Sequence, residues 1–244
     1  MRWPGPRHFQ AVGGRLEAQV RGRDPGRPFV VRDSVDRTQQ TTYVFYKRLL
    51  DFTLALLGLI VLTPLFLLLA GILLVFSGRP ILFSQVRVGR HGNRFRLYKL
   101  RTLPNGVPER SDREWSVQAP TRLMEFLRCT GLDELPQLFN VLRGDMSLVG
   151  PRPERPYFVE RFQKEERSYS KRHRLHAGIT GWAQVNGWRG NTSIRRRLEF
   201  DLFYLHHWSL AFDLRILRAT FTGFIRSTWD FARSQAGARH ARIA

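Results

Sequence analysis

The longest uncharged stretch of the chain constrains its fold more than any other feature. From Phe52 to Phe76, 25 consecutive residues carry no charged side chain, and most of them are Leu, Ile, Val, Phe or Ala. A helix needs roughly 20 apolar residues to cross the hydrocarbon core of a bilayer. The sequence therefore predicts a helix that enters a membrane, attached to a domain that stays in water.

A proline in the middle of this stretch argues against a straight span. Thr63-Pro64 divides it into two arms of about 12 residues, each roughly 18 Å long as a helix. Proline removes one helical hydrogen bond and clashes with the preceding turn, so we expect the helix to kink or break there. Neither arm alone crosses a core of about 30 Å.

Positive charges at both ends of the segment indicate the same side of the membrane. Lys47 and Arg48 precede it, and Arg79 opens a second basic stretch after it. Because basic flanks stay on the cytoplasmic side, the sequence favours a re-entrant helical hairpin over residues 43–78. The Thr63 hydroxyl is then available to the backbone groups that the proline leaves unpaired. A kinked helix that crosses the whole bilayer is the alternative.

The charge balance selects among partners. The chain carries 40 Lys and Arg against 20 Asp and Glu, a formal charge of +20. An excess of positive charge of this size indicates an anionic binding partner. The three candidates are nucleic acid, an anionic lipid bilayer and phosphorylated substrates. No nucleic-acid recognition motif accompanies the charge, so we expect no nucleic-acid partner. The single cysteine, Cys129, excludes an intramolecular disulfide and indicates a reducing compartment.

Composition divides the chain into four parts. Residues 1–42 are rich in Pro, Gly and Arg and indicate a disordered basic arm, and residues 231–244 indicate a disordered basic tail. The membrane hairpin is followed by a cytosolic domain at 79–230. Its pattern predicts a β-hairpin at 81–102, a loop at 103–120 long enough for a lid, and helices at 121–129, 133–142, about 157–174, 194–206 and 210–225. The expected fold is mostly α with a small β-hairpin (α+β).

The last of these helices suits two environments. Its apolar Phe212, Ile216 and Phe221 alternate with Arg215 and Arg218. An amphipathic helix with basic rims can lie in a membrane interface. It can equally pack on the core of the domain, and the pattern does not separate these alternatives.

Two adjacent carboxylates stand out in this basic chain. The stretch GLDELPQL places Asp133 and Glu134 just ahead of Pro136. One interpretation is a helix start, because Asp near an N-cap satisfies free backbone N–H groups and proline is tolerated in the first turn. The other is a catalytic acid pair, which needs basic groups around it to accept an anionic substrate.

Four basic residues lie in motifs that suit phosphate binding. Arg152 sits between two prolines in GPRP, and the restricted backbone gives its guanidinium a fixed position for bidentate contact with phosphate. Lys99 and Arg101 in YKLRT, spaced by two, share one face of a strand. Arg128 lies five residues before Asp133. Because they cluster around the acid pair, all four are candidate substrate-binding residues.

Four ordered motifs between Tyr46 and about Phe224 make the chain resemble a known enzyme family. They are KRLLDFTLALLGLIVLTP, YKLRT, GLDELPQLFNVLRGDMSLVGPRP and GITGWAQVNGWRG. In these the chain is similar to the bacterial sugar transferases, monotopic phosphoglycosyl transferases that move a sugar 1-phosphate from a nucleotide diphosphate sugar to a polyprenyl phosphate. The resemblance implies a place on the cytoplasmic face of the bacterial inner membrane, in the first membrane step of exopolysaccharide assembly.

The resemblance also implies roles for individual residues. Asp133 corresponds to the family's nucleophile, which forms a covalent phosphosugar intermediate, and Glu134 to the residue that helps hold Mg²⁺. Arg152 corresponds to a phosphate-binding arginine, and the family's re-entrant helix breaks at a Ser-Pro, here Thr63-Pro64. Two departures affect the nucleotide loop: HAG replaces Arg-Pro-Gly at residues 176–178, and a glycine replaces a serine two residues before the nucleophile.

Elementary electrostatics agrees with this interpretation. A carboxylate attacks the β-phosphorus of a UDP-sugar only if Mg²⁺ and arginines offset the charge of the diphosphate, and a helix N-terminus at Asp133 would keep it ionised. The expected substrates are undecaprenyl phosphate and a UDP-sugar, with glucose or galactose favoured over N-acetyl sugars, and UMP is the expected product. A non-catalytic basic membrane adaptor is the competing interpretation. The pattern leaves open the glycan pathway and the oligomeric state, a homo-oligomer included.

Overall fold

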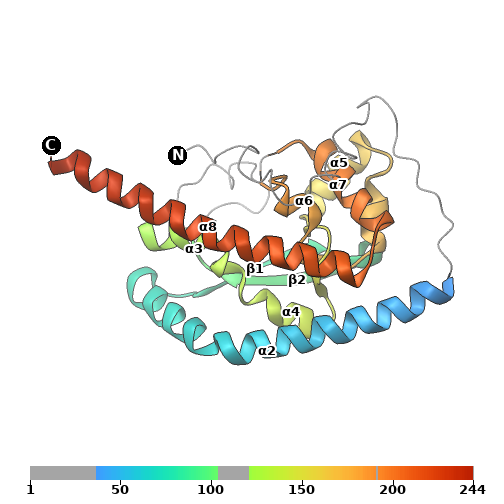
Figure 1. The fold of residues 1–244 in the computed structure, drawn as a ribbon, viewed down its shortest axis with the longest axis horizontal. Helices are drawn as coiled ribbons and strands as arrows, with labels where there is room; N and C mark the ends of the chain where they lie inside the picture. Colours follow the sequence, from blue (N-terminus) through green and yellow to red (C-terminus); the bar gives the residue numbers. More distant parts are fainter. Residues whose placement is uncertain (1–36, 104–120, 191, 244) are drawn as a thin grey trace.

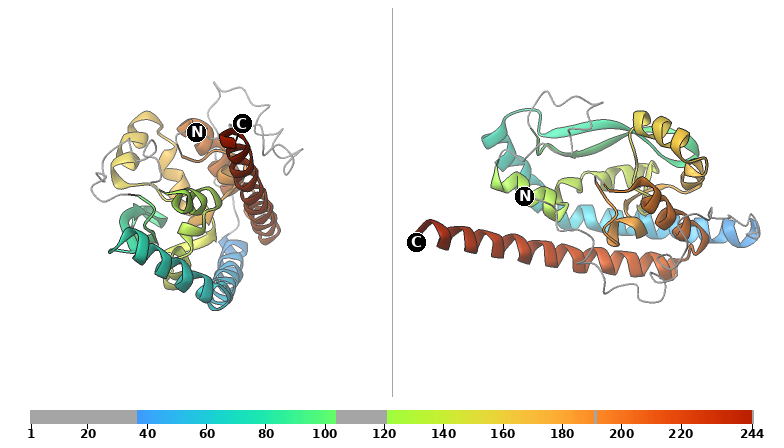
Figure 2. Two further views of the ribbon diagram at one scale, coloured as in Figure 1. Left: turned by 90° about the vertical axis from the view of Figure 1, so that its left-hand side faces the viewer. Right: turned by 90° about the horizontal axis from the view of Figure 1, so that it is seen from above.

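The structure, a computed structural model, describes residues 37–103, 121–190 and 192–243. Two long helices, α2 and α8, run along the molecule from the same end, and shorter helices and two small sheets pack against them (Figures 1 and 2). Most of the predicted basic arm and nearly all of the predicted lid loop lie outside the described residues. The mostly helical α+β class is confirmed.

Helix α2, Arg37–Ser77, contains the apolar stretch and stays α-helical through Pro64. Within the described residues it is the one helix long and apolar enough to cross a bilayer, and little of its apolar segment is buried inside the protein. Its exposed side chains are large and apolar, among them Leu57, Val61 and Val75. An exposed apolar surface of this extent indicates a helix that contacts lipid.

The break expected at Thr63-Pro64 is a bend in the structure. Pro64 has no N–H to donate, and the Thr63 hydroxyl donates to the carbonyl oxygen of Leu59, 2.5 Å away. A hydroxyl bonded four residues back bends a helix, as proline does. The second half of α2 accordingly turns away from the direction of the first (Figures 1 and 2).

The predicted β-hairpin is confirmed. Strand β1, Leu82–Val88, pairs antiparallel with β2, Arg94–Leu100, through the 3-10 turn η2, Arg90–Gly92. The sequence does not predict the second sheet, in which β3, Met146–Val149, and β4, Ala177–Thr180, pair in parallel. Strands of four residues are too short to show a period.

The helices of the domain follow the predicted ones with three differences, the first being a short helix at Trp182–Val185 that the sequence does not predict. The helices are α3, Arg122–Thr130; α4, Gln137–Arg143; α5, Pro156–Glu165; α6, Trp182–Val185; α7, Ile194–His206; and α8, Leu210–Ile243. The 3-10 turns η4, Leu132–Glu134, and η5, Tyr169–Arg174, interrupt the helices expected at 133–142 and 157–174. The sequence predicts a disordered tail, whereas α8 continues to Ile243, because the tail's Ala and Arg residues have high helix propensity.

Helix α8 has two apolar faces, one for each environment that its sequence suits: the core of the domain and the membrane interface. One face packs in the main core, where Phe212 and Ile216 lie among aromatic side chains of α6 and α7. Core packing is therefore confirmed. The other face keeps the pattern of an interfacial helix. Its exposed apolar side chains are Leu214, Phe221, Ile225 and Trp229.

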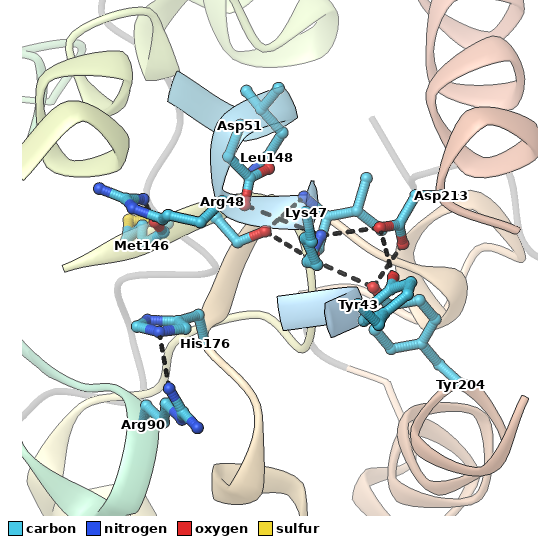
Figure 3. Close-up of polar contacts among 12 residues, drawn as sticks. Tyr43, Lys47, Arg48, Asp51, Arg90, Met146, Leu148, His176, Tyr204 and Asp213 are labelled. Carbon is cyan, nitrogen blue, oxygen red and sulfur yellow. Dashed lines mark hydrogen bonds and ion pairs between the residues drawn. The ribbon is translucent and has the colours of Figure 1, made fainter. Parts of the chain in front are cut away.

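A buried polar cluster fastens the start of α2 to the domain (Figure 3). Asp213 of α8 accepts hydrogen bonds from Lys47 at 2.8 Å and from Tyr43 at 3.0 Å. One turn along α2, Asp51 accepts a hydrogen bond from the backbone N–H of Leu148 in β3 at 3.0 Å. Because these charged side chains are buried and paired, they hold α2 at a fixed place beside β3.

Candidate active site

The two carboxylates lie on a tight turn between α3 and α4. Gly131 ends α3 in the left-handed conformation, with a φ of 81°, which favours glycine. The 3-10 turn Leu132–Glu134 follows, and Asp133 within it is buried. Helix α4 begins after Pro136, and no side chain caps it. The helix-cap interpretation of the acid pair is therefore wrong.

Arg152 binds Glu134 through two of its nitrogens. Its Nη2 lies 2.6 Å from Oε1 of Glu134, and its Nη1 lies 3.4 Å from Oε2. Burial raises the pKa of Glu134, but the charge and hydrogen bonds of Arg152, together with the charges of Lys99 and Arg189, outweigh burial and hold this pKa below its usual value. The pairing also raises the pKa of Arg152. Glu134 is thus a carboxylate, and Arg152 has a fixed position.

Asp133 has the opposite electrostatic balance. Burial raises its pKa to about 7, and the negative charge of Glu134 adds to the rise. Lys99, Arg152 and Arg128 act in the other direction without cancelling it. The sequence predicts a carboxylate kept ionised by a helix N-terminus, whereas the structure gives a group that changes protonation near neutral pH. Two carboxylates whose pKa values are driven apart are typical of catalytic sites.

Buried contacts fix the loop that carries Arg152. Gly150 lets two backbones approach, because a Cβ there would overlap the carbonyl oxygen of His176. The buried Arg172 donates to the carbonyl oxygen of Arg152 at 2.9 Å and is itself paired with Asp201. The rigidity that the sequence predicts from two prolines therefore also rests on tertiary contacts.

Arg189 is a site residue that the sequence analysis does not identify. It lies in the loop between α6 and α7, and its positive charge acts on Glu134 and lowers the pKa of that carboxyl. Burial and the nearby Arg152 lower the pKa of Arg189 itself. The motif GWRG contains this arginine, but its spacing does not distinguish it from the many others in the chain, and only the fold brings it to the acid turn.

Arg197 of α7 ties the two arginine-bearing loops together. Its Nη1 pairs with Glu154, which follows the Pro-Arg-Pro segment. Its Nη2 donates to the carbonyl oxygen of Gly190 at 2.5 Å, directly after Arg189. Because Arg197 and Glu154 are both buried, this pairing fixes the separation between the loops that present Arg152 and Arg189.

Five of the six predicted site residues gather at the turn. Arg101, the sixth, is buried at the end of α2, where its guanidinium donates to the carbonyl oxygens of Ser77 at 2.6 Å and Gly78 at 3.0 Å. These are the contacts of a helix cap. The binding role predicted for Arg101 stays a prediction. The five that gather are Lys99, Arg128, Asp133, Glu134 and Arg152.

The histidine of the HAG segment packs inside the domain. His176 is partly buried, and its Nε2 lies 3.3 Å from Nη1 of Arg90 (Figure 3). Burial and the charge of Arg90 lower the pKa of His176 to about 4. It is therefore neutral at physiological pH and brings no charge to the position where the resembled family has an arginine.

The carboxylate turn suits a hard divalent cation that also binds a substrate. Over residues 37–103, 121–190 and 192–243, no group of three or more His, Cys, Asp and Glu side chains gathers around a common point. The acid pair supplies two carboxylates, and Mg²⁺ commonly takes one or two of these and completes its shell with phosphate oxygens and water. A cation between Asp133 and Glu134 would also relieve the repulsion that helps raise the pKa of Asp133.

A bent, lipid-facing helix and a buried acid pair among basic residues define a membrane-associated protein whose site suits phosphate-bearing ligands. Comparison with known proteins supplies the family. The family model described as Bacterial sugar transferase matches residues 42–227, and the chain belongs to this family. The resemblance carried by the four sequence motifs is thereby confirmed.

Three relatives illustrate the range of the family. A UDP-glucose:undecaprenyl-phosphate glucose-1-phosphate transferase from Klebsiella pneumoniae is 41% identical over 75% of this chain and 41% of its own length. The protein of the same description from Escherichia coli K12 is 39% identical over 73% of this chain and 40% of its own length. A UDP-N-acetylgalactosamine-undecaprenyl-phosphate N-acetylgalactosaminephosphotransferase from Aeromonas hydrophila is 38% identical over 75% of this chain and 45% of its own length. The chain spans about two fifths of the length of these relatives.

Proposed function

We propose that the chain is a phosphoglycosyl transferase that moves a sugar 1-phosphate from a UDP-sugar to undecaprenyl phosphate and releases UMP. The observation that carries this proposal is the buried Asp133 beside the Glu134–Arg152 pair, within the positive field of Lys99 and Arg128. The three relatives described above are all transferases that act on undecaprenyl phosphate. A buried carboxylate among fixed cations is suited to attack an anionic phosphorus centre.

In the first half of the reaction, an ionised oxygen of Asp133 attacks the β-phosphorus of the UDP-sugar. The bond between this phosphorus and the oxygen that bridges to the α-phosphate breaks, and UMP leaves with that oxygen. The sugar phosphate stays on Asp133 as an acyl phosphate. Arg152 and Arg189, whose loops are locked together, stabilise negative charge on the phosphoryl oxygens in a site where burial strengthens the attraction.

In the second half, a phosphate oxygen of undecaprenyl phosphate attacks the same phosphorus. The bond from this phosphorus to the Asp133 oxygen breaks, and the sugar leaves on a diphosphate linked to the lipid. Splitting the transfer in this way means that the two anionic substrates need not occupy the site together. Ping-pong kinetics are the expected consequence.

We place Mg²⁺ at Glu134, with Asp133 beside it. When bound, the cation supplies positive charge that offsets the diphosphate of the donor. Glu134 would then serve two purposes: it orients Arg152 through their hydrogen bonds and presents an oxygen to the cation. Arg152 and the cation therefore converge on the same end of the substrate.

We place the site at the cytoplasmic face of the inner membrane. The bent α2 enters the bilayer as a re-entrant hairpin, supported by its exposed apolar surface and by the basic residues on both flanks. The exposed apolar face of α8 then lies in the lipid interface, with its arginines near anionic headgroups. This arrangement presents the lipid phosphate at the level of the acid turn.

Release of UMP from purified protein, a UDP-sugar and undecaprenyl phosphate tests the proposal. A panel of UDP-glucose, UDP-galactose, UDP-N-acetylglucosamine and UDP-N-acetylgalactosamine identifies the donor, since the relatives named above include both plain and N-acetyl sugars. We expect lipid-dependent UMP release with at least one of them. A folded protein that releases no UMP with the whole panel would instead favour the non-catalytic adaptor.

A further inference from the structure

The C-terminal part of α8 packs on the helix that leads into the acid turn. Helices α3 and α8 are in contact, and the rings of Phe126 in α3 and Phe231 in α8 lie with their centroids 5.3 Å apart. Phe231 lies beyond residue 227, the last residue that the family model matches. Family membership therefore assigns no role to this contact.

Helix α3 depends on its neighbours for its position. It has nine residues, too few to be a stable helix on its own. One face, with Met124 and Leu127, packs in a cluster with Leu69 of α2. Phe126 is only partly buried by that cluster, and the ring of Phe231 packs against it from α8. The helix is therefore held between the membrane helix and the end of α8.

Hydrogen bonds connect the ring contact to the acid turn without a flexible link. The Thr130 hydroxyl donates to the carbonyl oxygen of Phe126 at 2.8 Å. The N–H of Gly131 donates to the carbonyl oxygen of Leu127 at 2.9 Å, and the N–H of Glu134 donates to the carbonyl oxygen of Gly131 at 3.0 Å. A shift of α3 at Phe126 is thus passed to the carboxylates within a few residues.

We propose that Phe231 is a positioning residue for the acid pair. Its contact with Phe126 fixes α3, and α3 in turn fixes Asp133 together with Arg128, whose charge acts on Asp133. An aromatic pair of ordinary strength shifts a local opening equilibrium by about two- to tenfold. The consequence for turnover rests on the proposed function, whereas the packing role does not.

Cys129 gives a readout of α3 that is independent of catalysis. It is the single cysteine of the chain, it is half-buried near the end of α3, and burial raises the pKa of its thiol. In the whole chain in detergent, we expect Phe231→Ala to speed modification of Cys129 by N-ethylmaleimide about two- to tenfold. Phe231→Tyr, which keeps the ring, should restore the wild-type rate. Asp230→Ala, at an exposed neighbour on α8, is the matched control and should not change it.

Turnover of the same variants gives the second readout. The kcat for UMP release should fall about two- to tenfold in Phe231→Ala, with KM for the UDP-sugar unchanged, and should recover in Phe231→Tyr. An unchanged Cys129 rate in Phe231→Ala would overturn the proposal, as would a faster Cys129 reaction with an unchanged kcat. If the wild-type protein releases no UMP, the proposed function fails, and the Cys129 rates alone decide whether Phe231 fixes α3.

Discussion

Replacing Asp133 by asparagine should make the protein more stable at alkaline pH. Asp133 is buried, and burial together with Glu134 raises its pKa from 3.8 to about 7. The unfolded chain ionises this group near 3.8, so the folded state pays no penalty below that pH. As the pH rises from 3.8 to about 7, the folded state loses stability, and above 7 the loss is complete. Asparagine keeps the shape of the side chain and has no charge to bury.

The interval between the two pKa values sets the size of the effect. At about 1.4 kcal/mol per pH unit, the interval from 3.8 to about 7 corresponds to roughly 4 kcal/mol of destabilisation above pH 7. At pH 5 the same calculation gives less than about 2 kcal/mol. The advantage of asparagine should therefore grow by roughly 2 to 3 kcal/mol between pH 5 and pH 8.5. For a chain of this length, that is roughly 4 to 12 °C in Tm.

The adjacent Glu134 supplies the matched comparison. Arg152 holds its pKa below the unfolded value, so its charge contributes stability that is present above that unfolded value and is lost as the pH falls through the folded pKa. Glu134→Gln keeps the shape but removes the negative partner of Arg152. At pH 8.5 this variant should lose about 2 kcal/mol, the usual worth of a hydrogen bond between charged groups.

Thermal unfolding followed by tryptophan fluorescence at pH 5 and pH 8.5 measures both effects. EDTA keeps divalent cations from offsetting the carboxylate charges. At pH 8.5 the two neighbouring substitutions should move Tm in opposite directions. An Asp133→Asn advantage that is equal at both pH values would refute the buried charge, and a Glu134→Gln variant as stable as wild type would refute the ion pair.

Three further predictions concern the site and the membrane segment. Arg152→Ala should lower UMP release at least about tenfold while attachment of sugar phosphate to Asp133 stays detectable, because the substitution weakens substrate binding and keeps the nucleophile. Excess chelator should stop turnover and added Mg²⁺ should restore it, and full turnover in chelator would exclude the cation at Glu134. In a Cys129→Ser background, cysteines placed near residues 40 and 105 should both be shielded from an impermeant thiol reagent added outside intact cells. Reaction of the cysteine near residue 40 alone would indicate a helix that crosses the whole bilayer.

Local patterns determine the parts of the fold that the sequence predicts. Helix α7 at Ile194–His206 follows from its apolar period, and the hairpin β1–β2 follows from two β-rich runs around a glycine-containing loop. The parallel pair β3–β4 depends on contacts between distant segments, and its short strands have no readable period. The sequence pattern does not predict the extension of α8 to Ile243, because small and charged residues can form a helix that has no apolar stripe.

The site divides in the same way. The sequence identifies Asp133 and Glu134 as adjacent acids just ahead of a proline, and Arg152 as an arginine between two prolines. Arg189, in contrast, reaches the turn that carries the acid pair only through the loop held by Arg197. The sequence also does not reveal that Glu134 forms an ion pair, whereas burial raises the pKa of Asp133. That difference arises because the guanidinium of Arg152 bonds to Glu134, whereas the nearby positive charges only partly offset the burial of Asp133. Side-chain geometry of this kind has no signature in residue spacing.

The central claim is that sugar phosphate becomes bonded to Asp133, and labelling without the lipid acceptor tests it most directly. Protein incubated with a UDP-sugar labelled in the sugar should retain the label, release it with hydroxylamine as an acyl phosphate does, and carry it on the peptide that contains Asp133. Asp133→Asn, which should fold and be more stable than wild type at pH 8.5, should take up no label and release no UMP when undecaprenyl phosphate is added. Turnover by Asp133→Asn near the wild-type rate, or a label that maps to another residue, would contradict the claim.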